Sequence, residues 1–252
     1  MDDAALAHEL ADLADAITLG RFRSSSLRVE TKPDMSPVSQ ADREAEAAIR
    51  RRLAEARPGD AVLGEEGGGA GGSEASRRWI IDPIDGTRAY VRGMPVFATL
   101  IALEIEGSLT LGMVSAPALR RRWWAMRGEG AHADGRRIGV SAVRRVEDCV
   151  LSTGNITDLD VPRRAAVLRL GERCWSMRAL GDFWSHVLVA EGSVDVAVEP
   201  LGAVWDYAAL LPIVEEAGGR FTDLAGAARV DGVSAVSTNG LLHETVLEAL
   251  RP

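Results

Sequence analysis

Two aspartates follow a short apolar run in RRWIIDPIDGTRAY, residues 77–90, and their spacing can support metal-ion chemistry. Pro83 fixes its own φ and pushes the preceding residue towards extended geometry, so we expect a strand that stops at Asp82. Asp85 then stands where it can cap a helix, and Gly86 permits a ligand to approach the backbone closely. Free N–H groups at a helix start suit an anion, whereas adjacent carboxylates suit a hard cation. A metal-bound phosphate needs both at once.

Further acids elsewhere in the chain support this hypothesis. Glu65 follows another short apolar strand, in AVLGEE, and Asp206 begins a strongly apolar helix. If both converge with Asp82 and Asp85, the charges repel, and the acids cannot all stay ionised without a counter-charge. Ligands that are all oxygen atoms favour Mg²⁺ over Zn²⁺. Two simpler interpretations stay open: Asp82 and Asp85 are solvated acids of a capped turn, and Asp206 is a helix N-cap.

The residues required by other catalytic chemistries do not stand together. The sequence shows no Cys/His cluster, no Ser-His-Asp pattern and no nucleophile elbow. The glycine run at 67–72 lacks the Gly-Lys-Ser/Thr of a P-loop, so we predict a flexible loop there. Cys149 and Cys174 are predicted to be buried free thiols, as in a reducing cytoplasm. The scattered histidines are expected to be surface or packing residues, and they are His8, His132, His186 and His243.

The composition favours a globular protein without a nucleic-acid or membrane partner. A chain of 252 residues that is 46% hydrophobic can bury a large core, as one domain or two closely packed lobes. Its formal net charge of −8 argues against a nucleic-acid surface, and the basic-aromatic cluster at 120–124 is predicted to be a sheet edge or a subunit surface. No apolar stretch approaches the ~20 residues of a membrane span. The N-terminal residues do not resemble a signal peptide, so a cytoplasmic protein is expected.

Apolar periodicity predicts two lobes in one compact unit. Residues 1–143 are predicted to form an α+β lobe with most of the metal ligands, and Ser39 and Asp42 stand at capping-box spacing within it. Its expected elements are helices at 3–22 and 43–57, a loop or hairpin at 24–40 and a β-meander at 96–140. Residues 144–252 are predicted to form an α/β lobe that carries Asp206 and the residues for substrate specificity. Its strands are expected at 149–153, 194–200 and 219–223, between helices at 161–171, 183–191, 206–217 and 241–250.

Two long motifs identify a known family. WIIDPIDGT (79–87) and WDYAALLPIVEEAGG (205–219) resemble the two signatures of the inositol monophosphatase family, with further matches at 64–66 and 32–42. The matches occur in the family's order and span most of the chain. The resemblance implies a layered αβαβα sandwich, hydrolysis of phosphate monoesters with two or three Mg²⁺ ions per site, and a homodimer.

The resemblance also implies roles for individual residues. Ile84 would add its backbone carbonyl to the metal site, and Glu65 counts as catalytic as well as metal-binding. Thr87 and Asp42 match the pair that orients and deprotonates the attacking water. The amides of Gly86 and Thr87 would hold the phosphate. The side chains that match the family's metal ligands are Glu65, Asp82, Asp85 and Asp206.

Within the family, three segments resemble the bacterial histidinol-phosphatase branch most, and they are 91–103, 114–131 and 179–200. The chain departs from the family pattern at Arg-Ala-Tyr, 88–90, close to the expected phosphate. A substrate with an ammonium group and an imidazole needs an acid and a flat apolar wall. Glu199 and Asp182 can supply acids and Trp184 a stacking face, unless Asp182 is a helix cap and Trp184 is a core residue. Lys32 falls in the family's mobile loop, where its charge faces either the phosphate or solvent.

Alternatives to this substrate stay open. Inositol monophosphate would also need Glu199, for its hydroxyl groups, and other small monoesters are further candidates. An alternative from another class is a catalytically silent, metal-binding regulatory relative. The complete set of acids weighs against that alternative, because a silent relative has no physical need for it.

Overall fold

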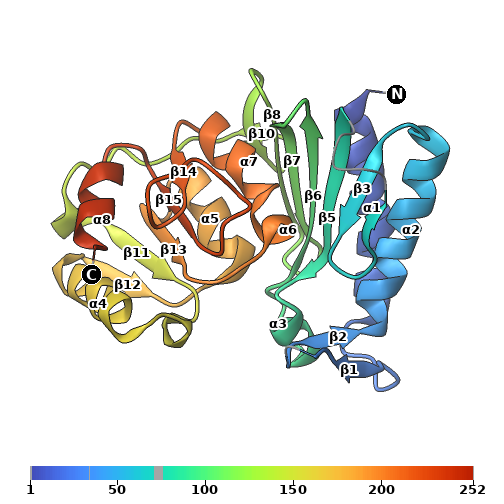
Figure 1. Cartoon of the computed structure of the whole chain (residues 1–252), viewed down its shortest axis with the longest axis horizontal. Coiled ribbons are helices and arrows are strands. Elements are labelled where there is room, and N and C mark those ends of the chain that lie inside the picture. The colour runs from blue at the N-terminus through green and yellow to red at the C-terminus, as the bar shows by residue number, and fades with distance from the viewer. Residues whose placement is uncertain (1, 34, 71–75, 252) are drawn as a thin grey trace.

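The chain folds into stacked layers in the order helices, sheet, helices, sheet, helices (Figure 1). The computed structural model describes residues 2–33, 35–70 and 76–251. Helices of the middle layer contact strands of both sheets and separate them. The arrangement confirms the predicted layered αβαβα sandwich, with its α+β part first and its α/β part second.

The first outer layer consists of two helices, α1 (Asp3–Arg21) and α2 (Gln40–Ala56). Both place their apolar faces against one side of the larger sheet. Ser39 and Asp42 form the predicted capping box at the start of α2. The predicted hairpin lies between the two helices and consists of β1 (Val29–Thr31) and β2 (Pro37–Ser39).

The larger sheet is mostly antiparallel and contains the predicted meander. Its strand order in the described residues is β10-β9-β8-β7-β6-β5-β3-β4, with only β3 and β5 parallel. The strands are β3 (Ala61–Gly64), β4 (Gly68–Ala70), β5 (Arg77–Asp85), β6 (Ala98–Ile105), β7 (Ser108–Ala116), β8 (Arg121–Met126), β9 (Gly130–Ala133) and β10 (Arg136–Arg137).

Two sequence predictions about this sheet are wrong. The glycine run was predicted to be a flexible loop, but residues 68–70 form β4, because their backbone pairs with β3; residues 71–72 lie outside the described residues. The basic-aromatic cluster was predicted to be a sheet edge or a subunit surface; the sheet edge is wrong, because β8 lies between β7 and β9, and the subunit surface stays a prediction. Trp123 of β8 is fully buried in the core, which a strand with neighbours on both sides permits.

Strand β5 also runs further than predicted. Its pairing with β6 is interrupted after Asp82 and resumes at Asp85, so the two aspartates flank an irregularity within one strand. Pro83 has no N–H to donate to the ladder, and the irregularity accommodates it. The Thr99 hydroxyl of β6 donates to the Pro83 carbonyl at 2.8 Å and holds this segment against the sheet.

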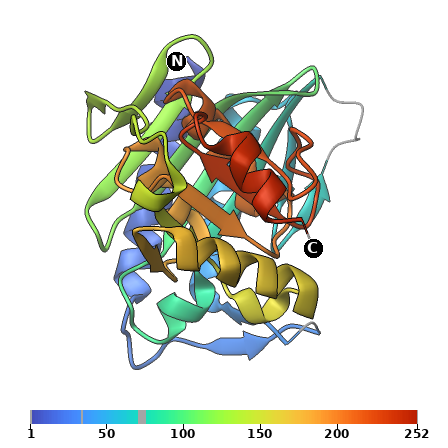
Figure 2. The same cartoon turned by 90° about the vertical axis from the view of Figure 1, so that its left-hand side faces the viewer.

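The smaller sheet and its helices make up the rest of the chain. Its strand order in the described residues is β12-β11-β13-β15-β14, and β12, β11 and β13 are parallel. The strands are β11 (Val150–Thr153), β12 (Ser176–Arg178), β13 (Val196–Glu199), β14 (Arg220–Thr222) and β15 (Ala235–Thr238). The helices are α4 (Val161–Arg173), α5 (Asp182–Ala190), α6 (Val204–Tyr207), α7 (Leu210–Glu216) and α8 (His243–Ala249). Figure 2 shows α4 and α8 on the outer face of this sheet.

The prediction of this half missed β12 and β15 and joined α6 and α7 into one helix. Both missed strands are short and carry no alternation that distinguishes them from loops. The helix break at Ala208–Ala209 has a physical cause. Pro212 cannot donate to a carbonyl one turn earlier, so it is tolerated only in the first turn of a new helix.

One core cluster joins the two sheets through α5, α6 and α7. The sheets occupy residues 61–137 and 150–238, on either side of the predicted lobe boundary at 143/144, and the division into two lobes stays a prediction. In the described part of the chain, no helix has the length and apolar character to cross a membrane.

The cysteines and histidines lie largely as expected. Cys149 and Cys174 are free thiols; Cys149 is buried, whereas Cys174 is only partly buried. His8 and His132 are partly exposed, and the other two histidines are buried. His243 uses both ring nitrogens, because each lies 3.0 Å from a threonine hydroxyl.

Candidate metal and phosphate site

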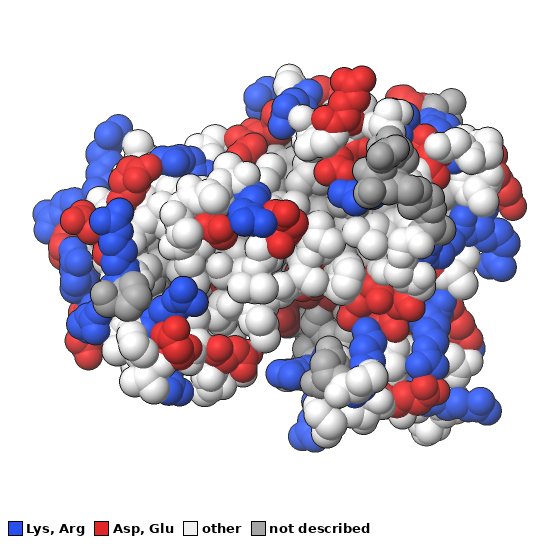
Figure 3. Space-filling view, in the orientation of Figure 1, with Lys and Arg blue, Asp and Glu red and all other residues white. Residues whose placement is uncertain are grey.

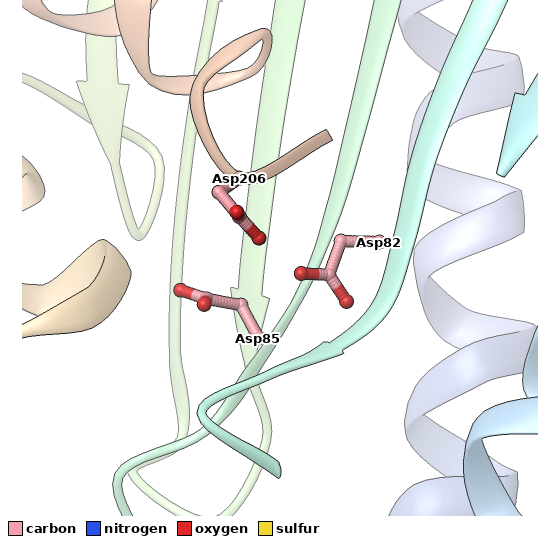
Figure 4. A group of neighbouring side chains, drawn as sticks. All are labelled: Asp82, Asp85 and Asp206. Atoms are coloured by element: carbon pink, nitrogen blue, oxygen red, sulfur yellow. The ribbon is translucent and has the colours of Figure 1, made fainter. Parts of the chain in front are cut away.

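Three carboxylates from different layers meet at the end of β5. Asp82 and Asp85 come from the larger sheet and Asp206 from α6, and one oxygen of each lies within 4.8 Å of the others (Figure 4). Burial and the nearby charges of Glu65 and Asp85 raise the pKa of Asp82 well above its ordinary value. Burial also raises the pKa of Asp206 to about 6. A buried group of acids with such pKa values is stabilised by a cation.

Backbone hydrogen bonds hold the first two acids. The Ile84 N–H donates to Asp82 Oδ1 at 3.0 Å. The Phe183 N–H of α5 donates to Asp85 Oδ2 at 2.6 Å, so Asp85 does not cap the next helix as the sequence predicted. That helix is α3 (Thr87–Val91), whose N-cap is Gly86 at φ 82° without any side-chain cap. The Asp85 carboxylate therefore accepts a hydrogen bond from the distant Phe183 N–H instead of capping α3.

The third acid depends on close packing between α6 and the larger sheet. Asp206 is the third residue of α6 rather than its N-cap, and its Oδ2 accepts the Ala203 N–H at 2.5 Å. Gly112 of β7 lies beneath the α6–α7 junction, where a Cβ would collide with the Ala209 carbonyl. The glycine thus allows the helix backbone to approach the sheet and carry Asp206 to the other two acids.

Glu65 reaches the same cleft but is already paired. Lys32 Nζ lies 2.7 Å from Glu65 Oε1 and 2.6 Å from Glu66 Oε1. Burial opposes the charge of Lys32, but the two ion pairs outweigh it and raise the lysine pKa above its ordinary value. Lys32 is therefore neither a solvated lysine nor a direct neighbour of the three aspartates; it neutralises the two glutamates.

Glu46 is a supporting residue that the sequence analysis missed. Its buried carboxylate accepts the N–H groups of Glu66 and Gly67, both at 2.8 Å, and the Arg50 Nε–H at 2.6 Å. These bonds fix the turn after β3 that presents Glu65. Gly64 faces the same carboxylate and leaves no space for a Cβ. A signal was available, because Glu46 is a charged residue on the apolar face of α2.

Asp42 and Thr87 form a second polar pair beside the three acids. The Ser39 N–H and hydroxyl donate to Asp42 Oδ2 at 2.8 and 2.6 Å. Asp42 Oδ1 faces Thr87, whose hydroxyl lies 3.4 Å from it and 2.9 Å from the Ile84 carbonyl. Burial raises the pKa of Asp42 to about 6. Oδ1 is therefore the oxygen that can take up a proton passed along by Thr87.

Three of these residues, Glu65, Thr87 and Asp206, line one cleft of about 650 Å³. Gly86, Asp182 and Glu199 line the same cleft. Acidic side chains gather in the hollow between the two halves of the molecule (Figure 3). The cleft therefore joins the three aspartates to the residues that were predicted to select a substrate.

The comparison with known proteins covers the whole site. Residues 2–252 match the model of the inositol monophosphatase family. The chain belongs to the inositol monophosphatase family. It is 51% identical to the histidinol-phosphatase of Mycobacterium tuberculosis, over 99% of this chain and 98% of that protein. Its fold matches an IMPase of Thermotoga maritima with a TM-score of 0.88 and 34% identity, over 99% of this chain and 97% of that chain.

A further structural relative bears on the ligands. An IMPase/NADP phosphatase, described as complexed with Mg²⁺ and phosphate, matches with a TM-score of 0.87 and 25% identity, over 98% of this chain and 94% of that chain. In the present chain the three aspartates offer only oxygen atoms, and the Ile84 carbonyl stands between two of them in sequence. This donor set fits a hard divalent cation, because its buried charges repel one another without one.

Asp182 and Glu199, two residues predicted to bind a substrate, lie together in the cleft. The Asp182 N–H donates to Glu199 Oε2 at 3.2 Å, so Asp182 is the first residue of α5 and not its cap. Gly154 touches Glu199 and leaves no space for a Cβ. Burial and the charge of Asp182 raise the pKa of Glu199 to about 8.

Trp184, unlike Asp182 and Glu199, does not line the cleft in the described structure. It is partly buried and packs against the core that joins the sheets, so the predicted stacking face is wrong and the core alternative holds. Trp184 does not line the cleft because of helical geometry. Phe183 and His186 lie three residues apart and share one face of α5, whereas the side chain of Trp184 lies on a different face.

The departure from the family pattern at 88–90 leaves the site intact. Arg88 lines the cleft, and Ala89 is nearly buried in α3. Tyr90 packs edge-on against Phe97, and its hydroxyl donates to the Thr18 carbonyl at 2.8 Å. Tyr90 therefore anchors α3 to α1 from behind, away from the phosphate.

Proposed function

We propose that this chain is a Mg²⁺-dependent phosphatase that converts L-histidinol phosphate and water into L-histidinol and phosphate, in histidine biosynthesis. The observation that carries the proposal is the cleft, which joins the group of three aspartates, through Asp206, to Asp182 and Glu199, a pair of acids for a cationic head group. Full-length similarity to a histidinol-phosphatase supports it. The substrate identity and the residue roles below are part of the proposal.

Two or three Mg²⁺ ions would be held by carboxylates and one carbonyl. When bound, they would neutralise the acids and the phosphate and lower the pKa of water. Lys32 would keep the second glutamate, Glu66, neutralised next to this group. The proposed ligands are Glu65, Asp82, the Ile84 carbonyl, Asp85 and Asp206.

Asp42 and Thr87 would move the proton of the attacking water. The Thr87 hydroxyl accepts a hydrogen bond from the water and turns its own hydrogen from the Ile84 carbonyl towards Asp42 Oδ1, 3.4 Å away. Both hydrogen bonds from Ser39 occupy Oδ2, so they orient the other oxygen towards Thr87. Above pH 6 Asp42 is mostly ionised and ready to accept the proton.

The backbone at Gly86 and Thr87 would hold the phosphate. Gly86 has φ 82°, and a Cβ there would lie 3.0 Å from the Val96 carbonyl and 3.4 Å from Asp182 Oδ2. Only glycine permits this conformation in that space. Phosphoryl transfer needs charge neutralisation and positioning more than covalent help, which suits amides on a rigid turn.

The other end of the substrate would lie against Glu199 and Asp182. An ammonium group beside Glu199 favours the ionised carboxylate and lowers its pKa from about 8. The positive head group and the acid therefore stabilise one another at neutral pH. We also propose that the enzyme acts as a homodimer in the cytoplasm, where its two free thiols would stay reduced.

The test is phosphate release by the purified protein from L-histidinol phosphate and from inositol 1-phosphate, each with Mg²⁺ and with EDTA. We expect EDTA-sensitive release that strongly favours L-histidinol phosphate. Preference for inositol 1-phosphate would overturn the substrate, and metal-independent release would overturn the chemistry. No release from either would support the silent regulatory relative. Light scattering coupled to gel filtration would test the homodimer.

A further inference from the structure

A small chamber of about 100 Å³ lies behind the selective side of the cleft. It shares Asp182, Glu199 and Asp206 with the cleft, so the two spaces adjoin. Its other lining residues are Asp85, Leu201, Phe183 and His186 of α5, Tyr207 and Leu210. Asp85 and Asp206 are proposed metal ligands, but neither the metal site nor the Asp42–Thr87 pair explains why His186 and Tyr207 line the chamber; these two, with Phe183 and Leu210, are called its inner wall.

Two polar atoms of the inner wall have no hydrogen-bond partner among the protein atoms that the structure describes. They are Nε2 of His186 and the hydroxyl oxygen of Tyr207, and each residue is only 1% exposed. Buried polar groups are nearly always paired, so an unpaired group that faces a chamber indicates a ligand. Tyr90 is equally buried, yet its hydroxyl is paired with Thr18.

The His186 ring and the Tyr207 hydroxyl are suited to bind a neutral, flat ligand. Burial lowers the pKa of His186 to about 3, so its ring is uncharged and has one N–H and one acceptor nitrogen. Nδ1 lies 2.6 Å from the Ser237 hydroxyl, which can donate or accept, so Nε2 is free to take either role. The Tyr207 hydroxyl can also donate or accept. Phe183 and Leu210 supply apolar surface between these polar edges.

We propose that this chamber is a ring pocket for the substrate: His186 Nε2 and the Tyr207 hydroxyl bind the two nitrogens of an N-heteroaromatic ring. The inference rests on the proposed function. It assigns the ammonium group and the ring of the substrate to two different binding places. The ammonium stays at Glu199 and Asp182, at the mouth of the chamber, and the ring enters it. A neutral imidazole has one N–H and one acceptor nitrogen, which the two orphan groups complement.

The size of the chamber favours a small ring over a polyol. At about 30 Å³ for each water in the liquid, the chamber holds roughly three waters, which is close to the size of a five-membered ring. A six-membered ring with a hydroxyl on every carbon is larger and needs polar partners on all sides. Asp85, Asp182, Glu199 and Asp206 could pair with some of these hydroxyls, but those that face Phe183 and Leu210 would stay unpaired.

The decisive variant is Tyr207→Phe, assayed on two substrates. L-histidinol phosphate has the phosphate, the ammonium and the ring, whereas 2-aminoethyl phosphate lacks the ring. We expect kcat/KM for L-histidinol phosphate to fall at least about tenfold, because a hydrogen bond to the ring is lost, while kcat/KM for 2-aminoethyl phosphate changes less than about twofold. Equal falls for both substrates, or no fall for either, would overturn the ring pocket.

Tyr90→Phe is the matched control, because it removes the other buried tyrosine hydroxyl. It should leave the ratio of the two kcat/KM values unchanged and lower the melting temperature by about 2–4 °C, since the buried hydrogen bond from the tyrosine hydroxyl to the Thr18 carbonyl is lost. Tyr207→Phe should not lower the melting temperature, since its hydroxyl has no protein partner in the described structure. A clear drop in Tyr207→Phe would mean that the hydroxyl has a structural role.

Binding without catalysis gives an independent readout. L-histidinol, the dephosphorylated product, should bind the wild-type protein in EDTA by calorimetry, and Tyr207→Phe should weaken this binding at least about tenfold. Unchanged binding would show that water alone occupies the chamber. If wild-type protein does not prefer L-histidinol phosphate to 2-aminoethyl phosphate, the proposed function fails; if it does and Tyr207→Phe keeps that preference, only the ring pocket fails.

Discussion

The two walls of the cleft are built in different ways. The reaction wall centres on one stretch of chain, residues 82–88, in which a strand irregularity, a left-handed glycine and a short helix follow one another. Asp42, Glu65 and Asp206 join this stretch from other parts of the chain. The selection wall takes Glu199 from β13, Asp182 from α5 and Tyr207 from α6. A single stretch can present reactive groups through its own backbone conformation. Selection of a ligand requires atoms that only the fold brings together.

The largest expected effect comes from breaking the reaction wall. Asp85→Asn should reduce phosphate release at least about a thousandfold on every substrate, because one charged ligand is lost from a metal site worth several kcal/mol. The protein should stay folded, since asparagine can still accept the Phe183 N–H and removes a buried charge. Phosphate release and the melting temperature in EDTA measure the two effects. Near-normal turnover by the folded variant would contradict the assignment of Asp85.

A change in the selection wall should affect substrates unequally. Glu199→Gln should lower kcat/KM for L-histidinol phosphate by about 10–100-fold, because a hydrogen bond between charged groups is worth about 1.5–3 kcal/mol. β-Glycerophosphate, which has no ammonium group, should change less than about twofold. Steady-state kinetics on both esters measure the difference. If both fall together, Glu199 belongs to the reaction wall and the distinction between the walls is wrong.

Gly112→Ala tests how α6 brings Asp206 to the reaction wall. The new Cβ would meet the Ala209 carbonyl and push α6 with Asp206 away from β5, at a cost of about 1–3 kcal/mol in unfolding free energy. The affinity for Mg²⁺ should fall as well. Denaturant unfolding and Mg²⁺ titration measure the two effects. Gly59→Ala is the control, since a Cβ there meets nothing within 4 Å.

A pH dependence of stability is shared by both walls. Asp206 and Glu199 have folded pKa values of about 6 and about 8, raised above the ordinary 3.8 and 4.5 mainly by burial. The folded protein therefore binds more protons than the unfolded protein, and stability in EDTA should fall as the pH rises from about 4 to about 8. Because Mg²⁺ needs ionised ligands, its stabilising effect should grow over the same range.

Thermal unfolding at a series of pH values, with Mg²⁺ and with EDTA, measures this dependence. Asp206→Asn removes one of the titrating groups, so its melting temperature in EDTA should fall less between pH 5 and pH 7 than that of the wild type. A wild-type slope no steeper than that of Asp206→Asn would contradict the raised pKa of Asp206.

Local signals predicted the reaction wall well. The capping box of Ser39 and Asp42, the two acids around Pro83 and the glycine at 86 each act within a few residues, so sequence spacing alone indicates them. The partner of Asp85 was beyond reach, because the Phe183 N–H lies 98 residues further along the chain. The same limit applies to Glu46, whose carboxylate binds amides 20 and 21 residues away.

The sequence by itself determined the chemistry of the candidate site: which acids flank Pro83, which helix is capped by Ser39, and that the candidate ligands all offer oxygen atoms. The backbone conformation around Pro83 and Gly86 depends mainly on residues that are close in the chain. The spacing of residues in the sequence is therefore enough to predict it. The tertiary structure alone decided that Trp184 packs in the core while His186 and Tyr207 face a chamber. Which face of α5 and α6 is buried depends on packing between layers, and adjacent residues of a helix point in different directions.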